Sequence, residues 1–283
     1  MDYDRKSLSE VGSHYDSITD GWRLILGNNF HFGYFERPEQ DLDSATRNLI
    51  IELEKLGPVP PGSSVLDVGC GIGEPAQILH ESLQCRVTGI SISQRGIELA
   101  RQMAHRKGLS GVLNFEVVDI LNNRIPSDTY DIAWVMESSH LMPDKLHLTR
   151  ELFRILKPDG KLLLCDMVRR RDLTAFDLIQ RADQFAAIDR TFGKAKTESP
   201  TFYREALQSA GFGAIEFRDI TEQAVPTLAA WRRNLEARRD EVIARLSEPR
   251  MRDYRDSCDH LEDLMQSGIL GYGLFGAAKP LSA

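Results

Sequence analysis

Residues 64–75 have the sequence Ser-Val-Leu-Asp-Val-Gly-Cys-Gly-Ile-Gly-Glu-Pro, and this stretch decides the fold. The apolar side chains of Val65, Leu66 and Val68 predict a short buried strand. Three glycines at alternate positions follow, and glycine permits both a positive φ and the close approach of a ligand to the backbone. A helix is predicted directly afterwards, over residues 74–83. A strand, a glycine turn and a helix N-terminus together form a site for an anionic or polar ligand group.

The spacing of the glycines narrows the choice of ligand. A dinucleotide fingerprint requires glycine at the position of Glu74, whose carboxylate would repel a pyrophosphate, and the chain contains no P-loop Gly-Lys-Ser/Thr tripeptide. The remaining motif, Asp67-x-Gly69-x-Gly71-x-Gly73, resembles that of class I S-adenosylmethionine-dependent methyltransferases. The resemblance implies S-adenosylmethionine as the cofactor and S-adenosylhomocysteine as the product. It assigns cofactor contacts in this stretch to Asp67, Gly69, Cys70 and Gly71.

The composition excludes several classes of protein. A net charge of −7 over 283 residues argues against nucleic-acid binding, which requires a basic surface. The four cysteines form no C-x-x-C pair, so neither a metal site nor a disulfide framework is expected. The longest weakly polar run, residues 268–278, is too short to span a membrane. With a charged N-terminus and no signal peptide, the expected location is cytoplasmic, without a membrane partner. A homo-oligomer is compatible with the sequence.

Strand and helix patterns alternate after the first strand. Further strands are predicted at residues 86–92, 113–119, 130–136, 161–168 and 215–219, with helices between them. This alternation predicts an α/β fold with a doubly wound, Rossmann-like sheet. The family resemblance implies a seven-stranded sheet in the order 3-2-1-4-5-7-6, whose last strand, within residues 268–280, is antiparallel.

The remaining helical patterns predict caps around this sheet. Residues 1–56 are expected to form an N-terminal helical cap, and residues 57–283 a methyltransferase core. Within the core, helical insertions are expected at about residues 172–198 and 221–267.

The N-terminal segment extends the resemblance. Tyr15-Asp16 followed by His31-Phe32-Gly33-Tyr34 is similar to the cap of tocopherol-type and natural-product sugar or aglycone methyltransferases. In those families the cap closes over the methionine end of the cofactor. The resemblance therefore implies a cofactor contact for Tyr15.

Further cofactor contacts are expected at the ends of the strands. Ser91 ends the second strand, where an acid usually binds the ribose hydroxyls; a serine can also hydrogen-bond a hydroxyl, and Gln94 could add an amide. The resemblance implies that Asp119 binds the adenine base, and the Ile120 N–H could donate a hydrogen bond to the adenine ring. Met136 ends the fourth strand, at the start of a segment that resembles the W-x-M-E-S stretch of tocopherol-type methyltransferases.

Three side chains are candidates for catalysis on a small organic acceptor, expected to be a secondary metabolite. A phenol or alcohol acceptor needs a base, and the unperturbed pKa of histidine, about 6.5, suits this role. His140 follows the fourth strand, and His31 in the cap is a second candidate. Glu137 could bind the cofactor ammonium or assist the acceptor. The alternative for His140 is a hydrogen-bonded histidine in the wall, and methylation at O, C or N is equally compatible with the sequence.

Two other functions compete with this interpretation. Arg169-Arg170-Arg171 follows the fifth strand and could clamp the phosphates of a prenyl diphosphate that is methylated at carbon. A catalytically silent protein that binds the cofactor and regulates a partner is the other alternative. Cyclopropane fatty-acid synthases share the fold, but the fourth-strand segment lacks the Glu-His pair of their bicarbonate site.

Overall fold

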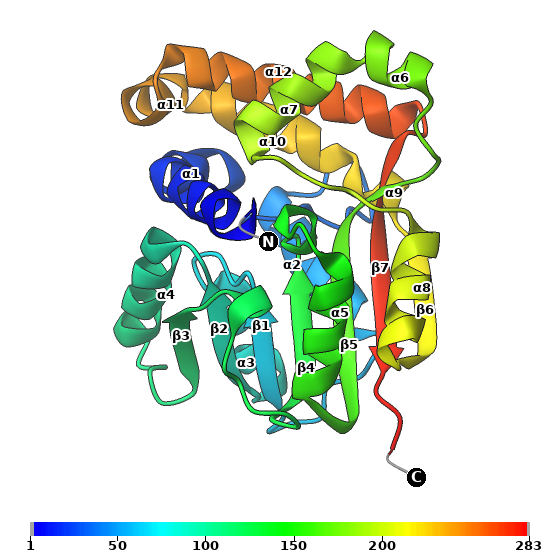
Figure 1. Cartoon of the computed structure of the whole chain (residues 1–283). Helices are drawn as coiled ribbons and strands as arrows, with labels where there is room; N and C mark the ends of the chain where they lie inside the picture. The colour runs from blue at the N-terminus through cyan, green and yellow to red at the C-terminus, as the bar shows by residue number, and fades with distance from the viewer. Residues whose placement is uncertain (1–2, 282–283) are drawn as a thin grey trace.

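The chain alternates strands and helices around one seven-stranded sheet (Figure 1). The computed structural model describes residues 3–281, with side chains from residue 10 onward. The strands are β1 (Ser64–Val68), β2 (Arg86–Ser91), β3 (Leu113–Val117), β4 (Tyr130–Met136), β5 (Leu156–Arg169), β6 (Gly213–Asp219) and β7 (Leu270–Ala278). The α-helices are α1 (Tyr3–Leu26), α2 (Leu42–Glu54), α3 (Glu74–Leu83), α4 (Gln94–Arg106), α5 (Lys145–Ile155), α6 (Ala175–Gln180), α7 (Ala182–Phe192), α8 (Pro200–Ala210), α9 (Thr221–Ala224), α10 (Pro226–Ala237), α11 (Arg239–Leu246) and α12 (Glu248–Gln266). Two 3-10 turns complete the set, η1 (Ile120–Asn122) and η2 (Ser139–Leu141).

The sheet confirms the predicted α/β class and the implied strand order. Within the described residues the order is β3-β2-β1-β4-β5-β7-β6, and β7 runs antiparallel to both of its neighbours. Trp134 and Val135 of β4 are fully buried, as expected for a parallel strand that is covered on both faces. The order reverses between β1 and β4, and open α/β sheets bind ligands beyond the carboxyl ends of the strands at such a point.

Several element boundaries differ from the predictions. β5 begins at Leu156 instead of residue 161, and its register with β4 shifts between Tyr130 and Ile132. The helical insertion expected at about residues 172–198 contains two helices, α6 and α7, because Arg181 leaves helical geometry, with φ −115° and ψ 14°.

A layer of helices covers the carboxyl ends of the strands. Figure 1 shows α1 together with α7, α10, α11 and α12 above this edge of the sheet. α1 approaches α11 closely because Gly21 has no side chain: a Cβ there would lie 2.3 Å from Leu246 Cγ. Aromatic rings join the layer, with centroid distances of 5.5 Å from Trp22 to Phe192 and 6.4 Å from Phe192 to Trp231. We refer to α1, α7 and α10–α12 as the helical layer.

The second N-terminal helix belongs to a different part of the molecule. α2 packs against α3, β5 and β7 instead of joining the helical layer. Asp41 begins it by accepting a hydrogen bond from the Ser44 N–H at 2.8 Å. The N-terminal segment therefore contributes α1 to the helical layer and places α2 against the sheet.

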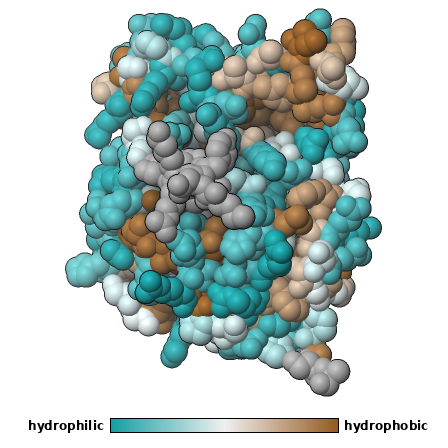
Figure 2. All heavy atoms as spheres, in the orientation of Figure 1, coloured by the Kyte–Doolittle hydropathy of each residue, from teal (hydrophilic) through white to brown (hydrophobic). Residues whose placement is uncertain are grey.

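The visible surface is largely hydrophilic (Figure 2). Exposed apolar side chains include Phe176 and Ile179 of α6, at 70% and 74% exposure. None of the helices in the described part of the chain combines the length and the apolar character needed to cross a membrane.

Candidate functional site

The glycine turn after β1 has the backbone that its sequence predicts. Gly69, Gly71 and Gly73 have φ values of 81°, 53° and 87°, in the left-handed region that favours glycine. At Gly69 a Cβ would meet the Ser138 Cβ at 2.2 Å, so this position requires glycine for contact with the segment after β4. At Gly71 a Cβ would meet nothing within 4 Å. The turn is therefore packed on one side and open to a ligand on the other.

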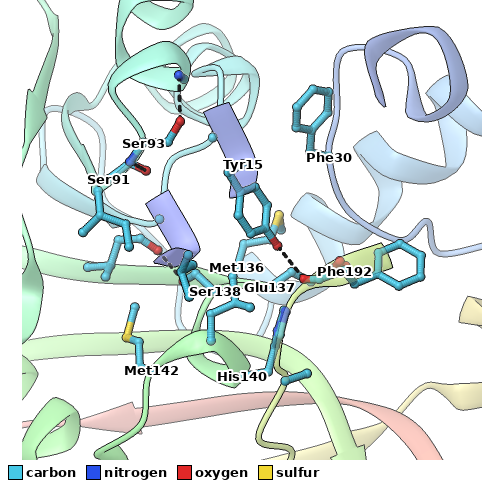
Figure 3. A pocket seen from close by; sticks show the side chains of 18 of the residues that line it. Tyr15, Phe30, Ser91, Ser93, Met136, Glu137, Ser138, His140, Met142 and Phe192 are labelled. Atoms are coloured by element: carbon cyan, nitrogen blue, oxygen red, sulfur yellow. Dashed lines mark hydrogen bonds between the residues drawn. The ribbon is translucent and has the colours of Figure 1, made fainter. Parts of the chain in front are cut away.

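Two adjoining pockets lie at this turn. The larger pocket lies between the carboxyl ends of the strands and the helical layer, and its lining is mostly apolar. The smaller pocket contains Asp67, Cys70 and His31. The two pockets share Gly69 and Gly71, among other residues, so they lie next to each other at the glycine turn. In Figure 3, Tyr15 and His140 point toward the same region of the larger pocket from opposite sides.

The structure brings most of the predicted cofactor residues together. Those in the larger pocket are Tyr15, Gly69, Gly71, Ser91, Asp119, Ile120 and Met136. Those in the smaller pocket are Asp67, Gly69, Cys70, Gly71 and Met136. Gln94 lies in neither pocket, because its side chain is exposed and donates to Glu98 at 3.1 Å. Ser93 and Gly96 line the larger pocket in its place.

The residues present suit S-adenosylmethionine. Asp67 is 2% exposed, and its Oδ2 has no hydrogen-bond partner among the described residues. Burial raises the pKa of this carboxyl to about 7, because an ionised carboxylate is costly to bury. A cationic group beside it would offset that cost. Asp119 Oδ1 accepts from the Leu121 N–H at 2.9 Å, which caps η1 while the residue lines the larger pocket. The helix-cap and ligand roles of Asp119 are thus compatible.

His140 forms a dyad with Asp166. The two carboxylate oxygens of Asp166 contact His140 Nδ1 at 2.7 Å and the His140 backbone N–H at 2.9 Å. Asp166 is fully buried, whereas the His140 side chain is 13% exposed and lines the larger pocket. Burial by itself would lower the pKa of His140, but the attraction and hydrogen bond of Asp166 outweigh it and raise this pKa. The proton on Nδ1 leaves Nε2 as the acceptor.

The carboxylate of Asp166 also accepts hydrogen bonds from groups other than His140. Ser139 Oγ donates to Asp166 Oδ2 at 2.5 Å and lies 2.7 Å from the Tyr203 hydroxyl of α8. The Met167 N–H donates to Asp166 Oδ1 at 2.8 Å. The imidazole and these hydrogen bonds keep the pKa of Asp166 below its usual value although burial alone would raise it. The sequence analysis did not identify this role of Asp166, because the residue belongs to no recognisable motif.

Glu137 connects the loop before α2 to the sheet. Its Oε1 accepts from the Phe32 N–H at 2.6 Å and from the Tyr272 hydroxyl at 2.5 Å. Its φ of 46° is uncommon outside glycine, and strained backbone of this kind clusters at functional sites. Burial raises the pKa of Glu137 to about 8. It lines the larger pocket beside His140.

His31 lies apart from the dyad. It lines the smaller pocket, and its Nδ1 is 2.7 Å from the carbonyl oxygen of Phe32. Burial lowers the pKa of His31 to about 4. A histidine with such a pKa is a weak base at neutral pH, so a binding role is favoured for His31 over proton abstraction.

The arginine cluster is occupied by ion pairs. Arg169 contacts Glu198 at 3.0 Å, and Arg170 contacts Asp219 at 3.2 Å. Arg171 makes two 2.7 Å hydrogen bonds to Asp177. None of the three arginines is among the residues that line the larger or smaller pocket. This arrangement does not favour the prenyl diphosphate alternative.

Known proteins resemble the chain along almost its whole length. The family described as Mycolic acid cyclopropane synthetase matches residues 3–270. The methyltransferase GfsG of Streptomyces halstedii is 30% identical over 281 residues, covering 96% of this chain and 94% of that protein. The 27-O-demethylrifamycin SV methyltransferase of Amycolatopsis mediterranei is 28% identical over 272 residues, covering 96% and 97%. The crystal structure of the [4+2]-cyclase SpnF has a TM-score of 0.83 at 25% identity and covers 97% of each chain.

Proposed function

The chain belongs to the mycolic acid cyclopropane synthetase family and is an S-adenosylmethionine-dependent methyltransferase of small molecules, and from this premise we propose that it methylates a hydroxyl group of an apolar secondary metabolite. The predicted class and cofactor are confirmed. A catalytically silent regulator is not favoured. The proposal concerns the acceptor and the residues that act on it.

The His140–Asp166 dyad is the observation that carries the proposal. When bound, the cofactor supplies an electrophilic methyl group on its sulfonium sulfur. The chain's own task is to hold the acceptor oxygen in line and to remove its proton. Asp166 fixes the tautomer of His140 with the proton on Nδ1, so that Nε2 can take the acceptor proton, as a buried aspartate does for histidine in other enzymes.

The lining of the larger pocket defines the acceptor. Tyr15, Trp22 and Phe192 contribute aromatic surface, and no lysine or arginine of the described chain lines this pocket. An uncharged acceptor with a large apolar body matches these walls, which also exclude water from the reaction. The relative named 27-O-demethylrifamycin SV methyltransferase supports an oxygen as the methyl acceptor.

An acceptor screen followed by one pair of variants tests the proposal. Purified protein is incubated with S-adenosylmethionine and a panel of phenols, alcohols, amines and prenyl diphosphates, and methylated products are identified by mass spectrometry. With a hydroxyl acceptor, His140→Ala should lower kcat by about 10²–10⁴-fold, with unchanged affinity for S-adenosylhomocysteine. His80→Ala is the control, because His80 Nδ1 contacts the backbone carbonyl oxygen of Cys85 at 2.8 Å instead of a carboxylate, and the residue lines neither pocket.

Either of two results would contradict this function. One is that only amines or prenyl diphosphates gain a methyl group. The other is that His140→Ala methylates a hydroxyl acceptor at the rate of the unsubstituted protein.

The cytoplasm is the proposed location, because all four cysteines are buried and free, as a reducing compartment allows.

A further inference from the structure

Lys145, the first residue of α5, is a buried cation that the proposed mechanism does not use. It is 3% exposed, and its Nζ donates to the Met142 carbonyl oxygen at 3.0 Å. Within the described part of the chain it forms no ion pair with a carboxylate. Lysine is almost never fully buried unless it is paired, and the N-terminus of a helix also disfavours a cation. This costly placement calls for a role that depends on the charge.

Two buried carboxylates attract this ammonium group, but both are already engaged with other side chains. Asp166 contacts His140 at 2.7 Å, and Glu198 contacts an arginine of β5 at 3.0 Å. Burial lowers the pKa of Lys145 to about 8; attraction by Asp166 and Glu198 limits this decrease, and repulsion by Lys196 adds to it. At pH 7 the charged form therefore predominates, and it acts on its surroundings without a direct ion pair.

The contact with Met142 places this charge at the segment that carries His140. Met142 follows η2 directly, and its N–H donates to the Ser139 carbonyl oxygen at 3.0 Å. The Lys196 N–H donates to the His140 carbonyl oxygen at 2.7 Å. Lys145 thus holds the end of η2 while a second segment holds its middle, so the buried cation and the imidazole keep a fixed relative position.

The charges that face His140 come from three parts of the chain and differ in sign. Burial lowers the pKa of His140, Asp166 of β5 and Glu137 after β4 raise it, and Lys145 of α5 lowers it. A base beside a buried carboxylate keeps its proton to a higher pH, and a cation nearby limits that effect. Asp166 and Lys145 therefore act in opposite directions on the same proton.

We infer that Lys145 is a positioning residue whose buried ammonium group keeps His140 in the unprotonated form that can accept the proton of the acceptor hydroxyl. This inference rests on the proposed role of His140 and deepens it. Lys145 lines neither pocket, so it acts through His140 and not on the acceptor itself. Asp166 orients the imidazole, and Lys145 limits the protonation that the same carboxylate promotes.

Three substitutions of Lys145 separate its charge from its hydrogen bond. Lys145→Met removes both, Lys145→Gln removes the charge but keeps a donor, and Lys145→Arg keeps both. Lys196→Met is the matched control, because it removes a positive charge from a neighbouring side chain that is 64% exposed and therefore screened by water. Removing a buried charge without a direct partner should not prevent folding. The unfolding midpoint checks this, and either neutral variant suffices for the test.

Nuclear magnetic resonance of the imidazole groups measures the pKa of His140 without any acceptor. The chain has seven histidines, and a His140→Gln variant identifies the signal of this one. In Lys145→Met and Lys145→Gln the pKa of His140 should rise by about half a pH unit or more, the scale for loss of a nearby buried charge. Lys145→Arg and Lys196→Met should leave it within about 0.2 of its value in the unsubstituted protein.

The pH dependence of the rate gives a second readout. With the hydroxyl acceptor that the screen identifies, kcat/KM of Lys145→Met should be about threefold or more lower on the acidic limb, the factor that half a pH unit represents. At high pH it should approach the value of the unsubstituted protein, because His140 is then unprotonated in both. A lysine that only held η2 in place would lower kcat/KM equally at every pH and leave the profile where it is.

The outcomes separate the inference from the function on which it depends. If the pKa of His140 is the same in the unsubstituted protein and in both neutral variants of Lys145, the inference is wrong whatever the acceptor is. If this pKa rises as expected but His140→Ala keeps the full rate, Lys145 does control the protonation of His140, and the proposed function is what fails.

Discussion

At the residue scale, two contacts of Asp166 determine what His140 can do. One oxygen fixes Nδ1 and the other binds the backbone N–H, so the ring has one orientation and one tautomer. Because the carboxylate charge raises the pKa of His140, the base form predominates only above the usual histidine pKa of about 6.5.

The pH dependence of the rate should report this coupling. We expect kcat/KM for a hydroxyl acceptor to rise with pH through one pKa above about 6.5. In Asp166→Asn the charge is lost, so the pKa of His140 should fall and the profile should move to lower pH. Its plateau should be at least about 100-fold lower, because the tautomer is no longer fixed. A profile of Asp166→Asn that coincides with that of the unsubstituted protein would separate Asp166 from catalysis.

Asp119 is expected to contribute to cofactor affinity. Asp119→Ala should weaken S-adenosylhomocysteine binding by about 1.5–3 kcal/mol, the value for a hydrogen bond to a charged group. Asp119→Asn should lose part of this amount. Calorimetry gives the affinities, and the unfolding midpoint without ligand checks that the loss of the η1 cap has not unfolded the variant. Unchanged affinity in Asp119→Ala would leave this residue with its capping role alone.

The sequence predicted the residues within single motifs better than the pairs between them. Asp67, Asp119 and His140 were predicted because each lies at or just beyond the end of a strand in a recognisable motif, and all three line one of the two pockets. The partnership of His140 with Asp166 depends on register: Met136 pairs with Cys165, so the segment that follows β4 becomes a neighbour of Asp166 within β5. Strand ends can be predicted from periodicity, but register is set by three-dimensional pairing.

At the element scale, α1 bridges the two sides of the larger pocket. Its His14 Nε2 is 3.0 Å from the Thr191 carbonyl oxygen, near the end of α7. Its Asp16 Oδ1 accepts from Ser93 Oγ at 2.6 Å, just before α4. α1 therefore connects the helical layer to the cofactor side, and we propose that the helical layer acts as a cap that closes on the bound cofactor.

Hydrogen exchange should detect this closure. Adding S-adenosylhomocysteine should slow amide exchange in α1 and in the loop at residues 28–35, because their opening would break contacts with the bound molecule. α8 is the internal control, since its residues line neither pocket. If exchange in α1 is unchanged while the ligand binds, α1 packs on the sheet without acting as a lid.

Helical periodicity predicted that the insertions would be helical but not how they pack. Leu228 and Trp231 of α10 are three residues apart, as on one face of an amphipathic helix, and both are buried. Trp231 also lines the larger pocket, so it is both a core residue and a wall of the site. The separation of α1 from α2 could not be predicted, because both helices are amphipathic and only tertiary contacts distinguish their faces.

At the scale of the whole molecule, the buried acids of the site should make stability depend on pH. The folded protein holds protons on Asp67 up to a pKa of about 7 and on Glu137 up to about 8. Both groups ionise near pH 4 in the unfolded chain, so the folded state binds more protons and its stability falls as pH rises. The raised pKa of His140 acts in the same direction. The lowered pKa of His31 opposes them only below about pH 6.5, where the unfolded histidine charges.

Between pH 6.5 and 8, therefore, the free energy of unfolding without ligand should fall by about 2 kcal/mol. Urea denaturation at several pH values gives this slope. Asp67→Asn should remove about 1 kcal/mol of the dependence, because its side chain does not titrate. Stability that rises over this interval, or an identical slope in Asp67→Asn, would show that Asp67 does not hold its proton to neutral pH.

The position of β7 has a consequence for how the chain folds. This strand follows all the others in sequence, yet it lies inside the sheet between β5 and β6. The edge strand β6 can therefore join only after the chain has passed through α9–α12 and returned. Such long-range pairing slows folding, and until it is complete the apolar edge of β5 remains available to other chains. Tyr272 of β7 also supplies the hydroxyl that binds Glu137, so the site and the sheet are completed in the same late step.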